Sequence, residues 1–385
     1  MRSHSYLNTA KLILENYDGS IPLSAWLKNF YSSNKKYGSK DRKIISELCF
    51  SYFRKGGLFQ LWTIEEQLVT ALFLTSTSQN IIINELRPEW VDLLNIDVKE
   101  KLSIVCPDCS INSILPFNKK LSKEIEVEKF NESFLIQPDV FIRIRPGKYE
   151  NVIRQLNDAT GLFKEITSSC IRLPNSSSID KLINIDEDAV IQDLNSQKVF
   201  NSTKSIIDNN KSLNVWDTCA ASGGKSILFK DLYPKAHLTV SDVRRTILIN
   251  LQNRFRRAHI DSYHSFEADL TLENNLPAKD FDFIICDVPC SGSGTWSRSP
   301  EQATFFNDQK LDHYNRLQRS IALNASKKLN KDGSFLYITC SVFARENEEM
   351  VNYLINNTSL QLISFNYYKG YEEKADTLFT ALFKA

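Results

Sequence analysis

Long apolar runs are absent from this chain of 385 residues. No stretch approaches the roughly 18 to 20 uninterrupted apolar residues that a membrane-spanning helix needs. The first residues form an amphipathic, polar stretch that lacks the apolar block and small-residue cleavage site of a signal peptide. We therefore expect a cytoplasmic protein without membrane contact.

An excess of charge of either sign is also absent, because 47 Lys and Arg against 46 Asp and Glu leave a formal net charge of +1. A basic surface for nucleic acid would have to come from local clustering. Cysteine is sparse, and eight in a chain this long do not form a disulfide framework. Cys106 and Cys109 form a lone CxxC with no second ligand pair nearby, so we expect reduced thiols and no metal.

The length of the chain predicts two or three domains. Apolar residues recur at helical spacing in the first part, as in Leu7 to Leu14 and Ile44 to Tyr52. Phe141 to Arg145 alternates apolar and basic residues and predicts a strand in a small mixed module. The expected domains are a helical domain (1–125), a small α+β module (126–205) and a larger domain with alternating strands and helices (206–385).

The last part alternates strand and helix signals, which predicts an α/β fold with a doubly wound parallel sheet. In such a sheet, ligands bind outside the carboxyl ends of the strands. Chemically useful residues follow all five of the expected strands, and the functional argument depends on these strand ends. The strands are expected at 214–216, 238–240, 264–267, 281–286 and 333–338.

The loop after the first of these strands is rich in small residues, which let the backbone approach a ligand closely. The helix beyond it offers free N–H groups to a carboxylate. Asp242 follows the second strand, where an acid suits ribose hydroxyls or serves as a helix N-cap. Asp269 follows the third. The loop residues singled out are Cys219, Ala220, Ala221, Ser222, Gly223, Gly224 and Lys225.

Two cysteines follow two further strands. Asp287-Val288-Pro289-Cys290 leads into a glycine-rich loop, and Thr339-Cys340-Ser341 closes the next strand. Both strand ends should open on the same face, whereas Cys286 lies inside its strand and is expected in the core. Two thiols at one ligand site fit the methylation of cytosine at carbon 5. In that reaction, a thiolate adds to carbon 6 of cytosine and makes carbon 5 nucleophilic, and a base must later remove the carbon 5 proton. Such a site must lower a cysteine pKa that starts at about 8.5.

At these residues the sequence resembles the Nol/Nop/Sun family of RNA (cytosine-5) methyltransferases, in particular bacterial ribosomal-RNA members with a NusB-like amino-terminal domain. Segments 217–225, 287–294 and 339–342 match three family motifs in order, and Glu346-Asn347-Glu348 follows the last. Weaker similarity lies upstream, in segments 41–54, 138–146 and 191–197. The likeness covers residues from about 130 to 350 well and the first 125 loosely.

The resemblance implies a Rossmann-like class I methyltransferase fold with S-adenosylmethionine as cofactor. Residues 219–225 would hold the methionine end of the cofactor, Asp242 its ribose, and Asp269 would lie near the adenine. Asp287 would face the cofactor and the target base. Cys340 would be the nucleophile, and Cys290 would assist product release.

The chain departs from the family pattern at three places. Ser222 stands where the family usually carries proline, and proline stiffens a loop. Ile247 occupies a position that is often basic, with Arg244 and Arg245 close by. Residues 376–379 replace the family's Gly-Phe-Phe before the last strand, which puts the last hairpin in question.

Basic clusters are the candidates for RNA contact, although each could equally be a solvated helix face. The target cytosine should be unpaired or flipped out to reach two thiols in a cleft. We expect a monomer acting on ribosomal RNA. Transfer RNA, a catalytically idle RNA-binding or assembly factor, and a DNA cytosine-5 methyltransferase that uses Cys290 as nucleophile remain alternatives. The basic residues are Arg143, Arg145, Arg244, Arg245, Arg254, Arg256, Arg257 and eight Lys or Arg from Lys28 to Lys55.

Overall fold

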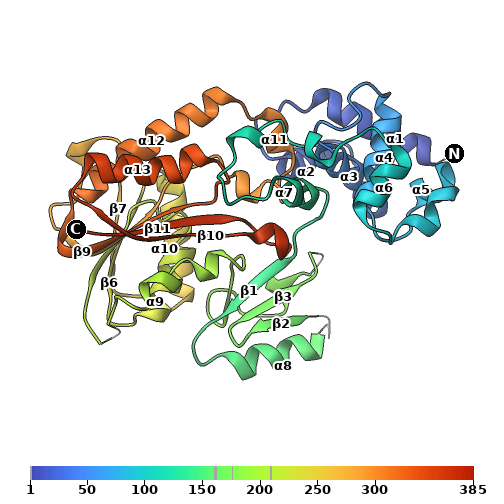
Figure 1. Ribbon diagram of the computed structural model, residues 1–385. Coiled ribbons are helices and arrows are strands. Elements are labelled where there is room, and N and C mark those ends of the chain that lie inside the picture. The colour runs from blue at the N-terminus through green and yellow to red at the C-terminus, as the bar shows by residue number, and fades with distance from the viewer. Residues whose placement is uncertain (1, 160–162, 176, 209) are drawn as a thin grey trace. The chain divides into compact units, whose positions relative to one another are not determined.

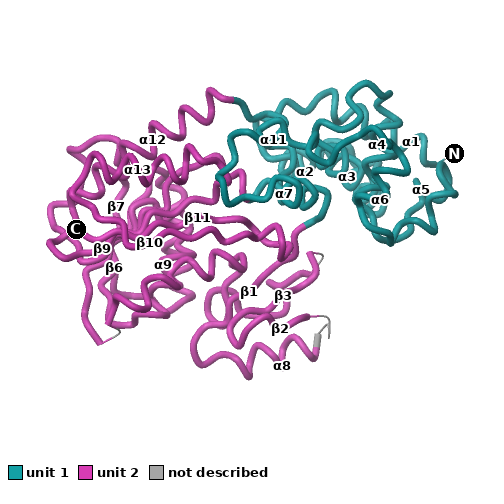
Figure 2. The backbone as a smooth tube through the Cα atoms, viewed as in Figure 1, with its two compact units in different colours: residues 1–137, 295–307 teal, residues 138–294, 308–385 magenta. Residues whose placement is uncertain are grey.

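The computed structural model describes residues 2–159, 163–175, 177–208 and 210–385. The chain forms two compact units, drawn in different colours in Figure 2. The first unit comprises residues 1–137 and 295–307, and the second comprises residues 138–294 and 308–385. The chain therefore returns to the first unit for a short segment before it completes the second. Among the described residues, no helix is both long and apolar enough to cross a membrane.

The first unit is helical, as the apolar periodicity predicts. Its helices bury residues such as Ala10, Ile13 and Leu48 completely. The Asp41 carboxylate, in the first turn of a helix, accepts the Gly38 N–H at 3.0 Å. The helices are α1 (Arg2–Asn16), α2 (Leu23–Ser33), α3 (Ser39–Arg54), α4 (Ile64–Thr75), α5 (Ile81–Leu86), α6 (Val98–Val105), α7 (Val127–Phe134) and α11 (Glu301–Phe305).

A small antiparallel sheet opens the second unit, with strand order β2-β3-β1-β4 and one helix, α8 (Figure 1). Asp193, in the segment that follows β4, accepts the Asp376 N–H at 3.0 Å. This bond ties the small sheet's end to the carboxyl-terminal hairpin. The elements are β1 (Val140–Ile144), α8 (Tyr149–Ala159), β2 (Lys164–Thr167), β3 (Cys170–Leu173) and β4 (Ala189–Ile191).

A seven-stranded sheet with the order β10-β11-β9-β8-β5-β6-β7 forms the rest of the second unit. Strands β9, β8, β5, β6 and β7 are parallel, and β11 runs antiparallel between β9 and β10. The predicted doubly wound α/β sheet is confirmed, and the last hairpin forms despite the departure at 376–379. The strands are β5 (Asn214–Asp217), β6 (His237–Asp242), β7 (Tyr263–Glu267), β8 (Phe281–Asp287), β9 (Leu329–Thr339), β10 (Gln361–Tyr368) and β11 (Leu378–Lys384).

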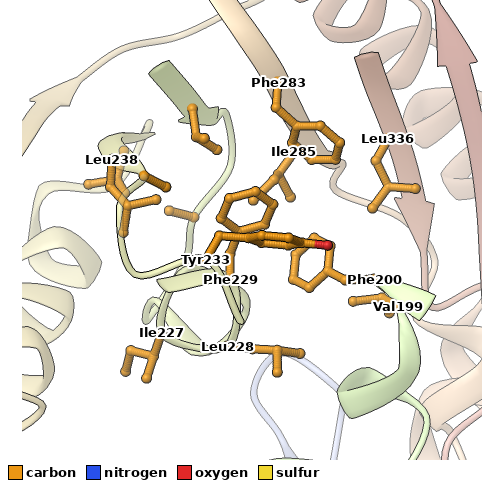
Figure 3. Close-up of a cluster of buried hydrophobic side chains, with 14 of the residues drawn as sticks. Val199, Phe200, Ile227, Leu228, Phe229, Tyr233, Leu238, Phe283, Ile285 and Leu336 are labelled. Carbon is orange, nitrogen blue, oxygen red and sulfur yellow. The ribbon is translucent and has the colours of Figure 1, made fainter. Parts of the chain in front are cut away.

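Both faces of the large sheet are buried by helices. Successive side chains of a strand point to opposite faces. Phe283 and Ile285 of β8 therefore join one core cluster, drawn in Figure 3, while Ile284 and Cys286 join the other. Cys286 is fully buried, as predicted. The helices are α9 (Gly224–Leu232), α10 (Arg245–Arg257), α12 (Asp308–Ser326) and α13 (Glu348–Asn357).

Two local predictions need correction. The strand expected at 333–338 begins earlier, at Leu329, shortly after α12 ends at Ser326. Cys106 and Cys109, expected as reduced thiols, are joined by a disulfide. Cys106 follows directly after α6 and the Cys109 N–H donates to its carbonyl at 3.0 Å, so a tight turn brings the two sulfur atoms together.

Candidate active site

A cavity of about 580 Å³ lies at the carboxyl ends of the parallel strands in the second unit. This volume is typical of small-molecule sites. Eight of the residues predicted for the site line it, whereas Ala220, Ser222, Gly223 and Gly224 lie behind the lining. The eight are Cys219, Ala221, Lys225, Asp242, Asp269, Asp287, Cys290 and Cys340.

The loop between β5 and α9 holds an unusual backbone shape. Ala221 has φ +47° and Gly223 has φ +82°, so both lie in the left-handed region. A Cβ added to Gly223 would come within 2.7 Å of the Phe255 ring, and this position therefore needs glycine. The loop ends at the start of α9, whose first N–H groups have no partner within the helix.

Asp242 closes β6 and is 4% exposed. Its Oδ2 accepts the Ala221 N–H at 3.1 Å, which joins it to the loop after β5. Its Oδ1 accepts both the backbone N–H of Arg244 at 2.9 Å and the Arg244 Nε at 3.0 Å. The carboxylate therefore closes the turn after β6 and lines the cavity, but it is not the N-cap of the following helix, because that position is Arg244.

Asp269 lies in the turn after β7. Its Oδ1 accepts the N–H of Thr271 at 3.0 Å and the Thr271 hydroxyl at 2.7 Å. These bonds fix the turn that carries Ala268 and Leu270 into the cavity lining. Asp269 thus shapes this end of the cavity besides offering its carboxylate.

Asp287 and Lys225 form an ion pair in the cavity lining, with Oδ2 and Nζ 2.6 Å apart. Burial lowers the pKa of Lys225, but the neighbouring Asp287 outweighs it and raises that pKa above its ordinary value. The lysine therefore keeps its positive charge close to Cys340, whose thiolate would also favour that charge.

The two predicted thiols lie together, with the Sγ atoms of Cys290 and Cys340 3.3 Å apart. The hydrogen bond to Cys340, together with burial, raises the pKa of Cys290 well above its ordinary value. The two sulfur atoms are in direct contact, and either thiol can be the donor of the bond between them.

A buried carboxylate holds the two cysteine loops together. Glu346 is fully buried and accepts the hydroxyls of Ser291 and Ser341, each at 2.5 Å. It also accepts the Ser291 N–H at 2.9 Å and the Gln318 amide at 2.8 Å. In the sequence, Glu346 stands out only as part of a motif, because nothing in its spacing shows that it reaches both loops.

Several lining residues carried no signal that predicted them for the site. Val243 follows Asp242 directly and is 55% exposed at the cavity. Tyr314 and Leu317 come from α12, a helix with ordinary amphipathic spacing. Their positions depend on how α12 packs against the sheet, which the local sequence does not reveal.

Most of the arginines considered for RNA contact are engaged inside the second unit. Arg143 and Arg145 both pair with Asp231, at 2.6 and 2.9 Å. Arg254 and Arg257 pair with the buried Asp186, and Arg244 pairs with Asp242. The exposed arginines that remain for RNA in this set are Arg245 and Arg256.

Comparison with known proteins places this geometry among methyltransferases. The family described as 16S rRNA methyltransferase RsmB/F matches residues 205–380. The ribosomal RNA small subunit methyltransferase B of Pectobacterium atrosepticum is 27% identical and covers 89% of this chain and 87% of that protein. The protein of the same name from Yersinia pestis is 23% identical, with the same coverage.

Two solved structures show the same fold. The crystal structure of PH0851 has a TM-score of 0.70 at 16% identity and covers 94% of this chain and 95% of that chain. A methyltransferase homolog protein from Pyrococcus horikoshii has a TM-score of 0.58 at 17% identity, covering 73% of this chain and 97% of that chain.

Proposed function

We propose, from the premise that the chain belongs to the RsmB/F family of Nol/Nop/Sun methyltransferases, that it methylates carbon 5 of a cytosine in RNA with S-adenosylmethionine as methyl donor. The observation that carries the proposal is the 3.3 Å contact between Cys290 and Cys340 at the end of a cofactor-sized cavity. One isolated thiol at a strand end would be an ordinary buried residue. Two thiols beside a cavity fit cytosine chemistry.

The residues present fit S-adenosylmethionine. The N-terminus of α9 offers N–H groups to a carboxylate, and the Asp242 carboxylate suits the two ribose hydroxyls. Val243, Ala268 and Leu270 supply apolar surface for a flat base. When bound, the cofactor supplies a methyl group on a positively charged sulfonium.

The protein's own part in the reaction is covalent catalysis. The Cys340 thiolate forms a bond from Sγ to carbon 6 of cytosine, which makes carbon 5 the nucleophile. After carbon 5 is methylated and loses its proton to a base, the bond from carbon 6 to Sγ breaks. Cys290, as a protonated thiol in contact with Cys340, assists this release. Lys225 keeps a positive charge near the Cys340 thiolate. Asp287 faces the target cytosine.

Single cysteine variants test this function. Cys340→Ala should lose methylation of cellular RNA and form no adduct, whereas Cys290→Ala should accumulate a covalent protein–RNA complex. Cys49→Ala, in a buried cysteine of α3, is the control for general effects of losing a thiol. Full activity in Cys340→Ala would overturn the mechanism, and wild-type protein that methylates no RNA would favour an idle assembly factor.

Ribosomal RNA is the substrate class that the relatives' names favour, with transfer RNA as the alternative. The target cytosine is flipped out or unpaired, since it must enter the cavity to meet Cys340. The protein acts as a cytoplasmic monomer. Bisulfite sequencing of RNA from cells without the protein should show one ribosomal cytosine that loses its protection.

The helical residues 1–125 form an RNA-binding domain in this proposal, with residues 126–205 as a second module and 206–385 as the catalytic domain. Within the basic stretch, Arg54 and Lys55 are buried and donate to backbone carbonyls, so they serve the fold. The lysines that stay exposed for phosphate are Lys28, Lys35, Lys36, Lys40 and Lys43.

Replacing Lys35, Lys36 and Lys40 with Gln should weaken RNA binding and flatten its salt dependence. Each lost phosphate contact lowers the slope of log affinity against log salt by about 0.7 to 0.9. The matched control replaces the exposed Lys204, Lys211 and Lys235 of the second unit with Gln. Equal slopes in the two triple variants would argue against an RNA surface on the first unit.

A further inference from the structure

The loop between β5 and α9, called the cofactor loop here, has no residue at position 222 that restricts its backbone. Ser222 lies between Ala221 and Gly223, which both adopt left-handed backbone conformations. A left-handed conformation is costly for a residue with a side chain, such as Ala221, and persists only where surrounding groups enforce it. Ser222 also stands where the family carries proline, which would restrict the backbone by itself. The chain therefore needs another source of rigidity here.

Arg254 of α10 supplies a contact at this position. Its Nη1 donates to the Ser222 carbonyl at 3.0 Å and to the Ser222 Oγ at 2.9 Å. Its Nε and Nη2 donate to Oδ1 of Asp186, at 2.9 and 2.8 Å. One guanidinium thus joins the cofactor loop to a fixed carboxylate.

The carboxylate at the other end is held firmly. Asp186 is fully buried, and its Oδ2 accepts two further bonds from Arg257, at 3.1 and 2.6 Å. Charge-assisted, bidentate pairs of this kind fix geometry as well as adding energy. Arg254 is therefore oriented before any ligand arrives.

The same helix also backs the neighbouring glycine. Phe255 and Leu251 of α10 lie so close to Gly223 that an added Cβ would meet them at 2.7 and 3.0 Å. Among the described residues, no backbone hydrogen bond starts from the Ser222 N–H, so a proline there would break none. Two side chains hold residues 221 and 222 of the loop. Arg254 donates to Ser222, and Asp242 accepts the Ala221 N–H.

We propose that Arg254 is a positioning residue for the cofactor loop, doing through Asp186 what proline does elsewhere in the family. The inference rests on the proposed use of S-adenosylmethionine in this cavity. Arg254 does not line the cavity and takes no part in the chemical step. Its loss should affect cofactor binding and leave turnover at saturating cofactor unchanged.

The test measures the dissociation constant of S-adenosylmethionine by calorimetry without RNA, and kcat for RNA methylation at saturating cofactor. Arg254→Gln should raise the dissociation constant about tenfold, the equivalent of roughly 1.4 kcal/mol, with kcat unchanged. Because Arg257 still pairs with Asp186, the variant should keep its fold. Arg154→Gln, which changes an exposed arginine of α8, is the control and should bind S-adenosylmethionine like wild type.

Rescue separates positioning from a general structural effect. Adding Ser222→Pro to Arg254→Gln should return the dissociation constant to within about threefold of wild type. Ser222→Ala, which removes the Oγ acceptor alone, should weaken binding by less than Arg254→Gln and covers the case in which that variant does not fold.

The outcomes are distinguishable. Wild-type binding in both Arg254→Gln and Ser222→Ala would overturn the positioning role, as would failure of proline to rescue a folded Arg254→Gln. Wild-type protein that does not bind S-adenosylmethionine would instead overturn the proposed function, and the inference with it.

Discussion

The two active-site thiols differ in their surroundings, although their sulfur atoms are 3.3 Å apart. The pKa of Cys290 is raised above all by its hydrogen bond to Cys340, and burial and the charge of Glu346 add to this. Since the thiolate is the reactive form of cysteine, the proposed mechanism assigns the attack to Cys340 and keeps Cys290 as a protonated thiol. The division follows from position, because both residues come from similar strand ends.

The reactivity of Cys290 should change when Cys340 is removed. In wild-type protein, the rate of Cys290 alkylation by iodoacetamide should keep rising at pH values above 9, because its pKa is raised. In Cys340→Ala, the pH midpoint of that rate should fall, since the largest cause of the shift is gone. Peptide mass spectrometry after brief alkylation measures both rates. An unchanged midpoint would contradict the proposed protonation of Cys290.

Asp217 should make the protein less stable as the pH rises. Its carboxyl is 1% exposed, accepts the Ser226 hydroxyl at 2.6 Å, and has an Oδ1 without a hydrogen-bond partner among the described residues. Burial raises its pKa to about 7, whereas an unfolded aspartate titrates at about 4. Between those values only the folded state keeps the proton, so the free energy of unfolding falls as pH rises.

Replacing Asp217 with Asn should remove this pH dependence. The contribution of a pKa raised from about 4 to about 7 is on the order of 4 kcal/mol between pH 4 and pH 7. Urea unfolding at pH 5 and pH 8 gives the change in the free energy of unfolding for each protein. The difference between wild type and variant isolates the contribution of Asp217, because the other titrating groups cancel. Equal pH slopes for the two proteins would show that Asp217 is ionised in the folded state throughout.

At the scale of elements, the strand ends are placed by the sheet, but the loops beyond them need their own support. The Cys290 and Cys340 loops follow β8 and β9, which are adjacent and parallel. Glu346 holds both loops through Ser291 and Ser341. The distance between the thiols therefore depends on a residue outside the cavity lining.

Glu346→Ala should cost stability and nearly abolish activity while sparing cofactor binding. It leaves two hydroxyls, an N–H and an amide without their acceptor, at about 1 to 3 kcal/mol for each buried group left unpaired. Thermal unfolding, methylation assays and calorimetry with S-adenosylmethionine measure the three effects. Glu346→Gln keeps one acceptor oxygen and should lie between wild type and Ala. Full activity in Glu346→Ala would show that the Cys290 and Cys340 loops keep their positions without this carboxylate.

The sequence predicted the doubly wound sheet, which the structure confirms, and methyl transfer from S-adenosylmethionine, which agrees with the RsmB/F family match over residues 205–380 and with the names of the curated relatives. It could do so because periodicity and strand-end motifs are local. The partners of Arg143 and Arg254 were not predictable, since they lie 88 and 68 residues away in the chain. A run of arginines therefore looked like a phosphate surface where the fold uses most of them internally.

At the scale of the whole chain, the path between the two units is the feature that sequence patterns missed. Residues 295–307 follow the catalytic loop directly but belong to the first unit. Trp296 is 1% exposed and packs near Phe117, with ring centroids 6.1 Å apart. The buried Glu301 accepts the Leu23 N–H at 3.1 Å. The segment's core is therefore built by residues more than 150 positions earlier.

A fragment of residues 138–385 should consequently fold poorly, although it contains every proposed catalytic residue. It would expose Trp296 and Phe305, and the loss of a buried aromatic contact surface typically costs about 3 kcal/mol or more per side chain. Residues 295–307, without the residues that bury them, would also disturb the adjoining loop that carries Cys290. Both solubility and methylation activity should therefore be lost. A second fragment, with 295–307 replaced by a Gly/Ser linker, should be more soluble and melt at a higher temperature than the first. Equal melting temperatures for the 138–385 fragment and the full chain would contradict this prediction. That result would mean that the second unit is stable without the residues of the first unit that surround Trp296.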